Sequence, residues 1–454
     1  MKRLVTLAIM AAFILGTAGL AKANVEFNII GGEFRTHVDA VKNPTFDSDD
    51  NVDTFNAYQR FRTNFEVVAN ENLRAFMQIQ YGPTGAGENR WGDDPGQGGI
   101  SEVGFRQAYL DFMIPNTEAQ VKAGWQHFAL PSTVGSHIFD GRAPGLTMHT
   151  PISPEVGITA GWLRADDNEQ GPVATSGDRR DDRDHFFAVV PVTLDGVEVN
   201  PFVWHTEEGR GFSYDDDETN NQTRGITYGG INATVDMFDP IVVHADFNYG
   251  SAGTRNDADP DANRLGQTRG WMAALAVDYH MDFMTPRAYF LYESGESSSS
   301  LDADNRGKRM PVVAPDLNNL TSFGFNSGEF GDVGFGQNRI AQFFPTHNGG
   351  DTTIGAWSLG VQLMDISFMD NLTHELQLAY YQGTNNKDLR DEDQFTTRDS
   401  AWEVNFNTKY DVYENLAAIV ELGYLGLSLS EDTPGARMED DDAWKASTGL
   451  KFSF

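Results

Sequence analysis

The sequence contains no cysteine, so disulfide bonds, thiolate nucleophiles and cysteine-ligated metal sites are all excluded. Basic residues are also scarce, because 33 Lys and Arg stand against 66 Asp and Glu, and the formal net charge is −33. Binding to nucleic acid requires a basic surface that can neutralise phosphates. The composition therefore excludes a disulfide scaffold and indicates that nucleic acid is not a partner.

Sequence motifs for catalysis are missing as well. The chain has no Gly-x-Ser-x-Gly nucleophile turn, no His-Glu-x-x-His zinc motif and no phosphate-binding loop. Its 10 histidines are scattered and form no cluster with the spacing of metal ligands. His244 and Asp246 lie two residues apart, but two polar residues on one face of a strand do not make a catalytic dyad. We predict that the protein is not an enzyme and needs no cofactor.

Long apolar runs are limited to one segment, Leu4–Leu20. It follows the basic pair Lys2 and Arg3 and precedes Ala21-Lys22-Ala23, which has the small-x-small form of a signal-peptidase site. The alternative is a transmembrane anchor, but a run of about 17 residues is at the lower limit for a span. We therefore predict a signal peptide over residues 1–23, export, and a mature chain of residues 24–454.

What the sequence has in abundance is alternation of apolar and polar residues. In the last twelve residues, one set of alternate positions holds Trp444, Ala446, Thr448, Leu450, Phe452 and Phe454. The other set holds Lys445, Ser447, Gly449, Lys451 and Ser453. A period of two places successive side chains on opposite faces of a β-strand. This segment is predicted to be a strand with one apolar and one polar face.

Similar alternating runs recur along the whole mature chain, and they predict an all-β protein. The number is eighteen, with sixteen as the alternative if two of the weaker runs merge or form loop structure. The predicted strands are 25–38, 53–69, 73–81, 101–114, 118–130, 143–152, 156–165, 185–194, 197–206, 224–237, 241–250, 269–281, 286–296, 353–366, 372–384, 400–411, 416–429 and 443–454. A transmembrane barrel exposes only alternate residues to lipid, so low average hydropathy does not argue against it. A soluble β-sandwich is the competing interpretation.

The connections between these runs alternate in length. Short ones such as Asp195-Gly196 and Tyr413-Glu-Asn415 are followed by long ones such as Ser297–Thr352. Short periplasmic turns and long external loops are typical of an outer-membrane barrel, whereas a sandwich has no reason to sort its loops in this way. We predict one domain, a transmembrane antiparallel up-and-down β-barrel whose two ends both lie on the periplasmic side.

The segment Leu130–Gly145 is predicted to fold into the barrel as a constriction loop. It is less acidic than the other long connections, and it carries Val134, Ile138 and Phe139, which could pack on the inner wall. Asp140 is the acidic candidate at the constriction, and the basic candidates on the polar strand faces are Arg60, Arg62, Arg74, Arg106 and Lys122. Opposed charges of this kind would set a transverse field across the pore. The alternative is that these arginines only form ion pairs with residues such as Glu66.

The long connections hold most of the acidic residues, for example Asp215–Glu218 and Glu439–Asp442. They could be solvated surfaces that resist aggregation, or they could bind divalent cations that bridge to anionic lipopolysaccharide. One segment places oxygen ligands at alternate positions, as Ca²⁺ sites do: Asp257, Asp259, Asp261 and Asn263. It lacks the glycine and the closing glutamate of an EF-hand loop, so it matches a Ca²⁺ site only in the spacing of its oxygen ligands.

The mature chain resembles Gram-negative outer-membrane porins, and among them the homotrimeric porins of sulfate-reducing bacteria. The resemblance rests on Asn24-Val-Glu-Phe-Asn-Ile-Ile-Gly-Gly, Arg106-Gln-Ala-Tyr-Leu-Asp-Phe-Met113, Ala123-Gly-Trp-Gln126 followed by Leu130-Pro131, and the final Phe454. Leu130–Gly145 resembles the third loop of general porins, which folds into the channel. In this family the terminal Phe454 and the preceding Phe452 serve as an assembly signal for the barrel-assembly machinery.

The resemblance implies a homotrimer in the outer membrane, in contact with lipid and lipopolysaccharide, that lets small hydrophilic solutes diffuse passively. Two other functions remain open. A substrate-selective channel could use Tyr58 and Phe76 on its inner face, and a structural or adhesive envelope barrel would depend on its loops instead of its pore. Ion selectivity also remains open, because the net negative charge favours cations while the inner arginines favour anions.

Overall fold

The computed structural model describes residues 25–44, 46, 53–81, 89–91, 103–133, 138–166, 182–209, 222–256, 267–301, 306–313, 328–330, 352–392, 395–430 and 441–454. Within these ranges the only helices are two short 3₁₀ turns, η2 (Ser298–Leu301) and η3 (Lys387–Glu392). No helix in the described part of the chain is long and apolar enough to cross a membrane. The predicted signal peptide, residues 1–23, lies outside the described residues.

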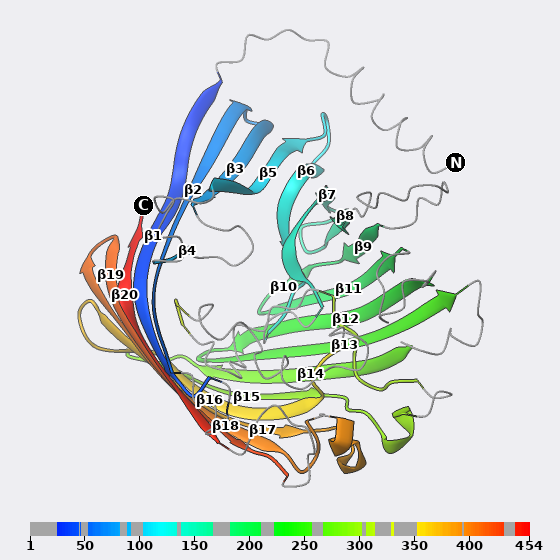
Figure 1. Cartoon of the computed structure of the whole chain (residues 1–454). Coiled ribbons are helices and arrows are strands. Elements are labelled where there is room, and N and C mark those ends of the chain that lie inside the picture. Colours follow the sequence, from blue (N-terminus) through cyan, green and yellow to red (C-terminus); the bar gives the residue numbers. More distant parts are fainter. Residues whose placement is uncertain are drawn as a thin grey trace.

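Antiparallel strands form one continuous sheet that closes on itself. The strands are β1 (Glu26–Lys42), β2 (Thr54–Asn70), β3 (Leu73–Tyr81), β4 (Asn89–Arg90), β5 (Val103–Met113), β6 (Gln120–Ala129), β7 (Asp140–Pro151), β8 (Gly157–Asp166), β9 (Arg183–Val189), β10 (Val192–Leu194), β11 (Val197–Glu208), β12 (Gln222–Phe238), β13 (Ile241–Asn256), β14 (Thr268–Tyr279), β15 (Thr285–Glu293), β16 (Ala356–Met369), β17 (Leu372–Gly383), β18 (Ser400–Tyr413), β19 (Leu416–Ser428) and β20 (Asp442–Ser453). Figure 1 shows the red β20 beside the blue β1, where the ring closes.

These twenty strands make a barrel wall of eighteen. The two-residue β4 pairs only with β2, inside a long connection. β9 and β10 are two parts of one strand, because both pair with β11 and the backbone N–H of Val190 still bonds to Pro201 between them. Pro191 has no N–H to give to the ladder, which accounts for the interruption. The prediction of eighteen strands is confirmed, and the alternative of sixteen is excluded.

The two ends of the barrel differ as the sequence predicts. We call them the short-turn end, where both chain termini of the barrel lie, and the long-loop end. At the short-turn end the Asp195-Gly196 hairpin places Gly196 at φ 68°, the left-handed conformation that such a turn requires. Several strand boundaries differ from prediction, and at the candidate site β7 begins at Asp140 and so includes residues 140–145 of the predicted loop.

The outer face is apolar because alternate side chains point away from the ring. Every strand from β13 to β20 places an aromatic residue on this face near the long-loop end: Tyr249, Trp271, Tyr292, Trp357, Tyr380, Trp402, Tyr424 and Trp444. Neighbouring rings touch, and the Trp271 and Tyr292 centroids are 4.8 Å apart. Such an arc is the aromatic girdle expected where a barrel meets a membrane–water interface.

The inner face is not uniformly polar. Toward the long-loop end it carries a buried apolar cluster, in which wall residues such as Trp204, Tyr228 and Tyr289 pack with residues from the connections. The connecting segments contribute Phe46, Leu130, Ile138, Phe139, Met310 and Phe395, all almost fully buried. Burying six such side chains inside the barrel means that the connections fold inward and narrow the interior.

Candidate functional site: the narrowed interior of the barrel

Three of the predicted basic residues come together on the inner face of β2 and β5. Arg60 Nε donates to Glu33 Oε1 over 2.7 Å, and Arg62 Nη1 lies 3.7 Å from the same oxygen. Arg62 Nε and Arg106 Nη1 both donate to Gln80 Oε1 over 2.6 Å. Three guanidinium groups thus lie together around Glu33 and Gln80 on the inner wall, and we call them the arginine cluster.

Arg74 and Lys122 lie apart from this arginine cluster, nearer the short-turn end. Arg74 forms ion pairs with Asp111 at 2.8 Å and Glu66 at 3.0 Å, which matches the alternative that the sequence left open for it. Half of the Arg74 side chain remains exposed. The Lys122 ammonium lies over the Tyr109 ring, 5.5 Å from its centroid. These residues therefore do not extend the arginine cluster.

A fourth arginine, Arg35, was not among the candidates. The strand register places it directly opposite Arg60 on one side and Lys451 on the other, so three basic residues form a row across β20, β1 and β2. The alternation Glu33, Arg35, His37 is visible in the sequence and could have assigned Arg35 to the inner face. What the sequence could not reveal is that β1 and β20, at opposite ends of the chain, bring Arg35 beside Lys451.

Asp140 does not face the arginines. It is the first residue of β7, and its carboxylate lies 2.6 Å from His127 Nε2. His127 shares the outer face of β6 with Trp125, while Gln126 between them is buried inside. The structure therefore places Asp140 on the outside of the barrel wall. Its neighbour Phe139 points inward, because successive side chains along a strand lie on opposite faces.

A carboxylate opposite the arginine cluster comes from the other side of the ring. Asp246 lies on the inner face of β13, half-way round the eighteen strands from β2. Asn232 Nδ2 donates to Asp246 Oδ1 over 2.5 Å. Glu403 on β18 and Glu421 on β19 are also buried inner carboxylates, but these strands lie near β2 on the side where the ring closes. Among these three carboxylates, Asp246 is therefore the one across the ring from the arginine cluster.

The constriction loop folds inward as far as its described residues show. Ile138 and Phe139 are both buried, and the Phe139 ring stacks on Trp204 of β11 with centroids 4.7 Å apart. The backbone N–H of Thr133 donates to Asp246, and Asn232 Nδ2 donates to Thr133 Oγ1 over 3.1 Å. The loop therefore extends from β6 to the inner wall of β12 and β13. Val134 lies outside the described residues.

A second connection reaches inward from the other side. Residues 306–313, between β15 and β16, bring the Val313 N–H to the Ile138 carbonyl at 3.3 Å. Met310 and Pro311 of this segment pack on the wall, and the Pro311 ring lies against Gly250 of β13. Two connections from different parts of the ring meet at this contact, so the passage must run beside them.

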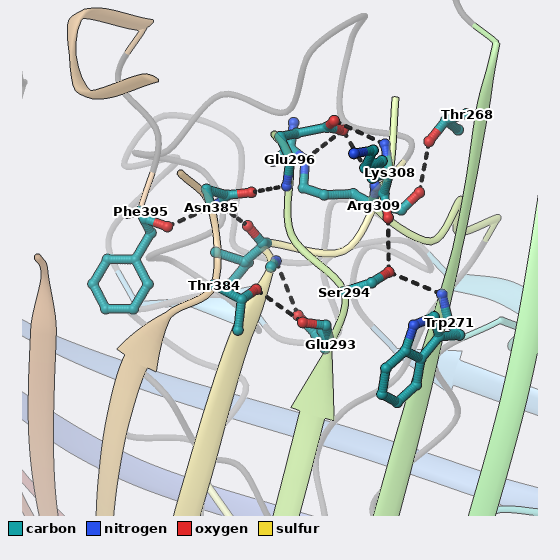
Figure 2. Close-up of polar contacts among 12 residues, drawn as sticks. Thr268, Trp271, Glu293, Ser294, Glu296, Lys308, Arg309, Thr384, Asn385 and Phe395 are labelled. Carbon is teal, nitrogen blue, oxygen red and sulfur yellow. Dashed lines mark hydrogen bonds and ion pairs between the residues drawn. The ribbon is translucent and has the colours of Figure 1, made fainter. Parts of the chain in front are cut away.

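Polar contacts hold residues 306–313 to the ends of β14 and β15, as Figure 2 shows. Thr268 Oγ1 donates to the Arg309 carbonyl over 2.6 Å, and Ser294 Oγ donates to the Lys308 carbonyl over 2.7 Å. The Glu296 carboxylate accepts the N–H groups of Lys308 and Arg309, at 2.8 and 3.2 Å. Each bond satisfies a backbone group that would otherwise be buried unpaired, which fixes the segment in place.

Asn385 completes this network from the β17–β18 connection. Its side-chain oxygen accepts the Glu296 N–H over 2.8 Å, and its Nδ2 donates to the carbonyls of Ile354 and Phe395. Burial lowers the pKa of the Arg309 guanidinium, while the Glu296 carboxylate 3.5 Å away acts in the opposite direction. The site therefore contains a buried ion pair within the β15–β16 connection, and Asn385 of the β17–β18 connection bonds to it.

The two residues proposed for a solute track each lie against another ring. Tyr58 stacks on His37 with centroids 5.3 Å apart, and Phe76 stacks on Tyr109 at 5.1 Å. Tyr58 and Phe76 are on different strands, and each contacts a partner on its own neighbouring strand. They form two separate aromatic pairs on the inner wall and not one continuous slide.

The C-terminal aromatic residues lie at the seam where β20 meets β1. Gly32 and Phe454 exchange two backbone hydrogen bonds, at 2.8 and 3.1 Å. The Phe454 ring covers Gly32, where an added Cβ would come within 2.5 Å of the ring, and it stacks between Phe61 and Phe452. These contacts are on the outer face, so Phe452 and Phe454 belong to barrel closure and not to the pore.

The described residues contain no candidate metal site. No group of three or more His, Asp or Glu side chains suited to a metal ion occurs among the residues that the structure describes. The Ca²⁺ candidates Asp257, Asp259, Asp261 and Asn263 lie outside those residues. The Ca²⁺ site therefore stays a prediction from the sequence.

No protein-family model matches the chain, and no curated protein sequence matches it either. Solved structures share its fold. OccK3 (OpdO) of Pseudomonas aeruginosa has a TM-score of 0.54 at 11% identity, with 95% of this chain and 96% of that chain covered. The outer membrane protein OprD of P. aeruginosa has a TM-score of 0.52 at 11% identity, with coverage of 96% and 95%. OccAB4 of Acinetobacter baumannii has a TM-score of 0.54 at 10% identity, with coverage of 96% and 100%.

Proposed function

We propose that this chain is an outer-membrane channel through which small hydrophilic solutes diffuse passively. The observation that carries the proposal is a closed barrel of eighteen strands with an apolar outer face and charged residues on its inner face. Barrels of this size enclose an interior that is large enough for water and solutes. Diffusion down a gradient needs no cofactor and no catalytic group.

A substrate-selective channel is the second candidate, and the narrowing favours it. The contact between Val313 and Ile138 joins two inward connections, and the arginine cluster lies on the wall across from Asp246. A solute with an anionic and a cationic group can turn each toward the wall of opposite charge, so small dipolar solutes should pass best. Among the similar structures, P. aeruginosa OpdK has been solved with vanillate, a small carboxylate.

The location and partners follow from the same proposal. The outer face would contact membrane lipid and lipopolysaccharide, and the terminal strand with Phe454 would be the part that the barrel-assembly machinery reads. A homotrimer, as the resemblance to porins of sulfate-reducing bacteria implies, and a signal peptide over residues 1–23 belong to this proposal. Ca²⁺ at residues 257–263 would link the acidic connections to lipopolysaccharide.

Reconstitution into planar lipid bilayers tests the proposal directly. We expect discrete conductance steps from the purified mature chain, and a reversal potential in a salt gradient that reports ion preference. Saturable flux of one solute class in liposomes would favour the selective channel over a general porin. A folded barrel, checked by its heat-dependent mobility on gels, that gives no conductance would contradict both and favour a structural or adhesive role.

A further inference from the structure

Two residues of the β15–β16 connection, Glu329 and Phe330, lie inside the barrel against the wall where it closes. The wall residues that contact them come from three strands, β1, β19 and β20. We call these residues the seam pocket: Arg35, His37, Glu421, Lys445 and Lys451. Lys445 and Lys451 thus face inward as the alternation of β20 predicts, but they meet this dipeptide as well as the interior of the barrel.

The seam pocket binds the backbone of the dipeptide at both polar groups of each residue. Glu421 Oε1 accepts the N–H of Glu329 over 2.5 Å and the N–H of Phe330 over 3.0 Å. Arg35 donates to the Glu329 carbonyl, and Lys445 Nζ donates to the Phe330 carbonyl over 3.5 Å. Glu421 accepts hydrogen bonds from N–H groups, and Arg35 and Lys445 donate hydrogen bonds to carbonyls. Such an arrangement can bind a peptide backbone in one chain direction only.

The two side chains are also matched by chemistry. The Phe330 ring has no solvent-exposed area and lies parallel to the His37 ring, with centroids 4.4 Å apart and planes at 12°. It packs against Ala417 and Ile419 of β19. The Glu329 carboxylate lies 2.5 Å from Lys451 Nζ and keeps 39% of its side chain exposed. One end of the pocket therefore takes a buried ring, and the other takes a carboxylate that remains open to the interior.

We propose that the seam pocket is a binding site for short peptides with an acidic residue followed by an aromatic one, and that Glu329–Phe330 is its tethered occupant. The inference rests on the proposed channel function and names one solute class for it. Its groups are fixed by the strand register of the closed barrel, so the pocket is preorganised for a ligand. A tethered occupant competes at an effective concentration of the order of millimolar, so free peptide should bind weakly until the occupant is weakened.

The test uses N-acetyl-Glu-Phe-amide, which carries the same groups as the internal dipeptide, added to single channels in planar bilayers. In the variant Glu329→Ser with Phe330→Ser, we expect the half-blocking peptide concentration to fall at least about tenfold below that of the unmodified channel. Adding Lys451→Met should raise it again by about tenfold, because a charge-assisted hydrogen bond is lost. Phe330→Ala is the milder variant and should shift block in the same direction.

N-acetyl-Gln-Phe-amide and N-acetyl-Glu-Ala-amide are the matched probes, and both should block far less. Leu389→Ala is the matched variant, because it truncates a buried apolar side chain of η3 in another connection, and it should leave peptide block unchanged. Equal block of all variants by all three peptides, or no block of any variant, would overturn the seam pocket as a ligand site and leave the dipeptide as a structural brace. Absence of conductance in the unmodified chain and Leu389→Ala alike would instead contradict the proposed channel.

Discussion

At the scale of single residues, the interior is organised by which face of a strand a side chain occupies. Arg60, Arg62 and Arg106 converge on Glu33 and Gln80 because all five lie on inner positions of neighbouring strands. Buried guanidinium groups retain their charge when each finds an acceptor. Three guanidinium groups gathered on the inner wall tie these residues to ion preference more than to stability.

The substitution of Arg60 and Arg62 together by Ala tests this directly. It removes two positive charges beside Glu33, so this part of the inner wall becomes less positive. We expect the reversal potential in a KCl gradient to shift toward that of a cation-selective pore. Arg142→Ala removes the same type of charge from the exposed outer side of β7 and should leave the potential unchanged. An unaltered potential in the double variant would mean that ions do not pass this cluster.

At the scale of elements, the two inward connections determine how narrow the passage is. The loop after β6 is fixed at Thr133 by Asp246 and at Phe139 by Trp204, and it meets residues 306–313 at Ile138. The apolar contacts supply most of the stability here, since the rings are removed from water on all sides. The loop is therefore part of the barrel core and not a separate flap.

The variant Phe139→Ala should weaken this element. Removing a buried phenyl ring that stacks on Trp204 costs about 3–5 kcal/mol in comparable cores. We expect a lower urea midpoint for unfolding in detergent and a larger single-channel conductance, because the loop loses its hold on the wall. Phe247→Ala, at an exposed position on the outer face of β13, is the matched control and should change neither value by a similar amount. If Phe139→Ala lowers the urea midpoint but leaves the conductance unchanged, the loop after β6 does not form the narrowest part of the channel.

The sequence was most informative about the strands and least informative about what crosses the interior. Alternation and loop length yielded all eighteen strands, because a period of two is a local property. The contact of Val313 with Ile138 and the position of Asp246 opposite the arginines depend on which strands face each other across the ring. Asp140 shows the limit most clearly, because the sequence predicts it in an inward-folded loop, whereas as the first residue of β7 it lies on the outer face.

At the scale of the whole molecule, closure depends on the pairing of β1 with β20. Their register joins Glu33 to Ser453 and Lys42 to Trp444 without interruption. Closing the ring removes both sheet edges, which would otherwise be templates for aggregation. Phe454 and Gly32 extend this pairing by two backbone hydrogen bonds beyond the last strand residue.

Deletion of Phe454 should therefore reduce the yield of closed barrels, without changing the conductance of those that form. Gly32→Val should act in the same direction, because its Cβ would meet the Phe454 ring and the Arg62 carbonyl, both within 2.5 Å. The measurement is the fraction of heat-modifiable barrel in outer-membrane preparations, followed by bilayer recording. Val412→Ala, an exposed outer position at the end of β18, serves as control. A normal yield of closed barrel in both variants would show that the contact between Gly32 and Phe454 is not needed for assembly.

The seam also sets an order of events in folding. Asn43 donates a side-chain hydrogen bond to the Asp442 carbonyl, a contact between residues 399 positions apart, whereas most strands pair with their immediate neighbours in the chain. Contacts of high sequence separation form late, because the entropy of the intervening chain must be lost first. The sheet can therefore grow strand by strand as an open, curved sheet. In it β1 pairs with β2 on one edge, and its other edge stays unpaired until β20 forms. Glu329–Phe330, bonded to β1, β19 and β20 at once, can be fully bound only after that last step.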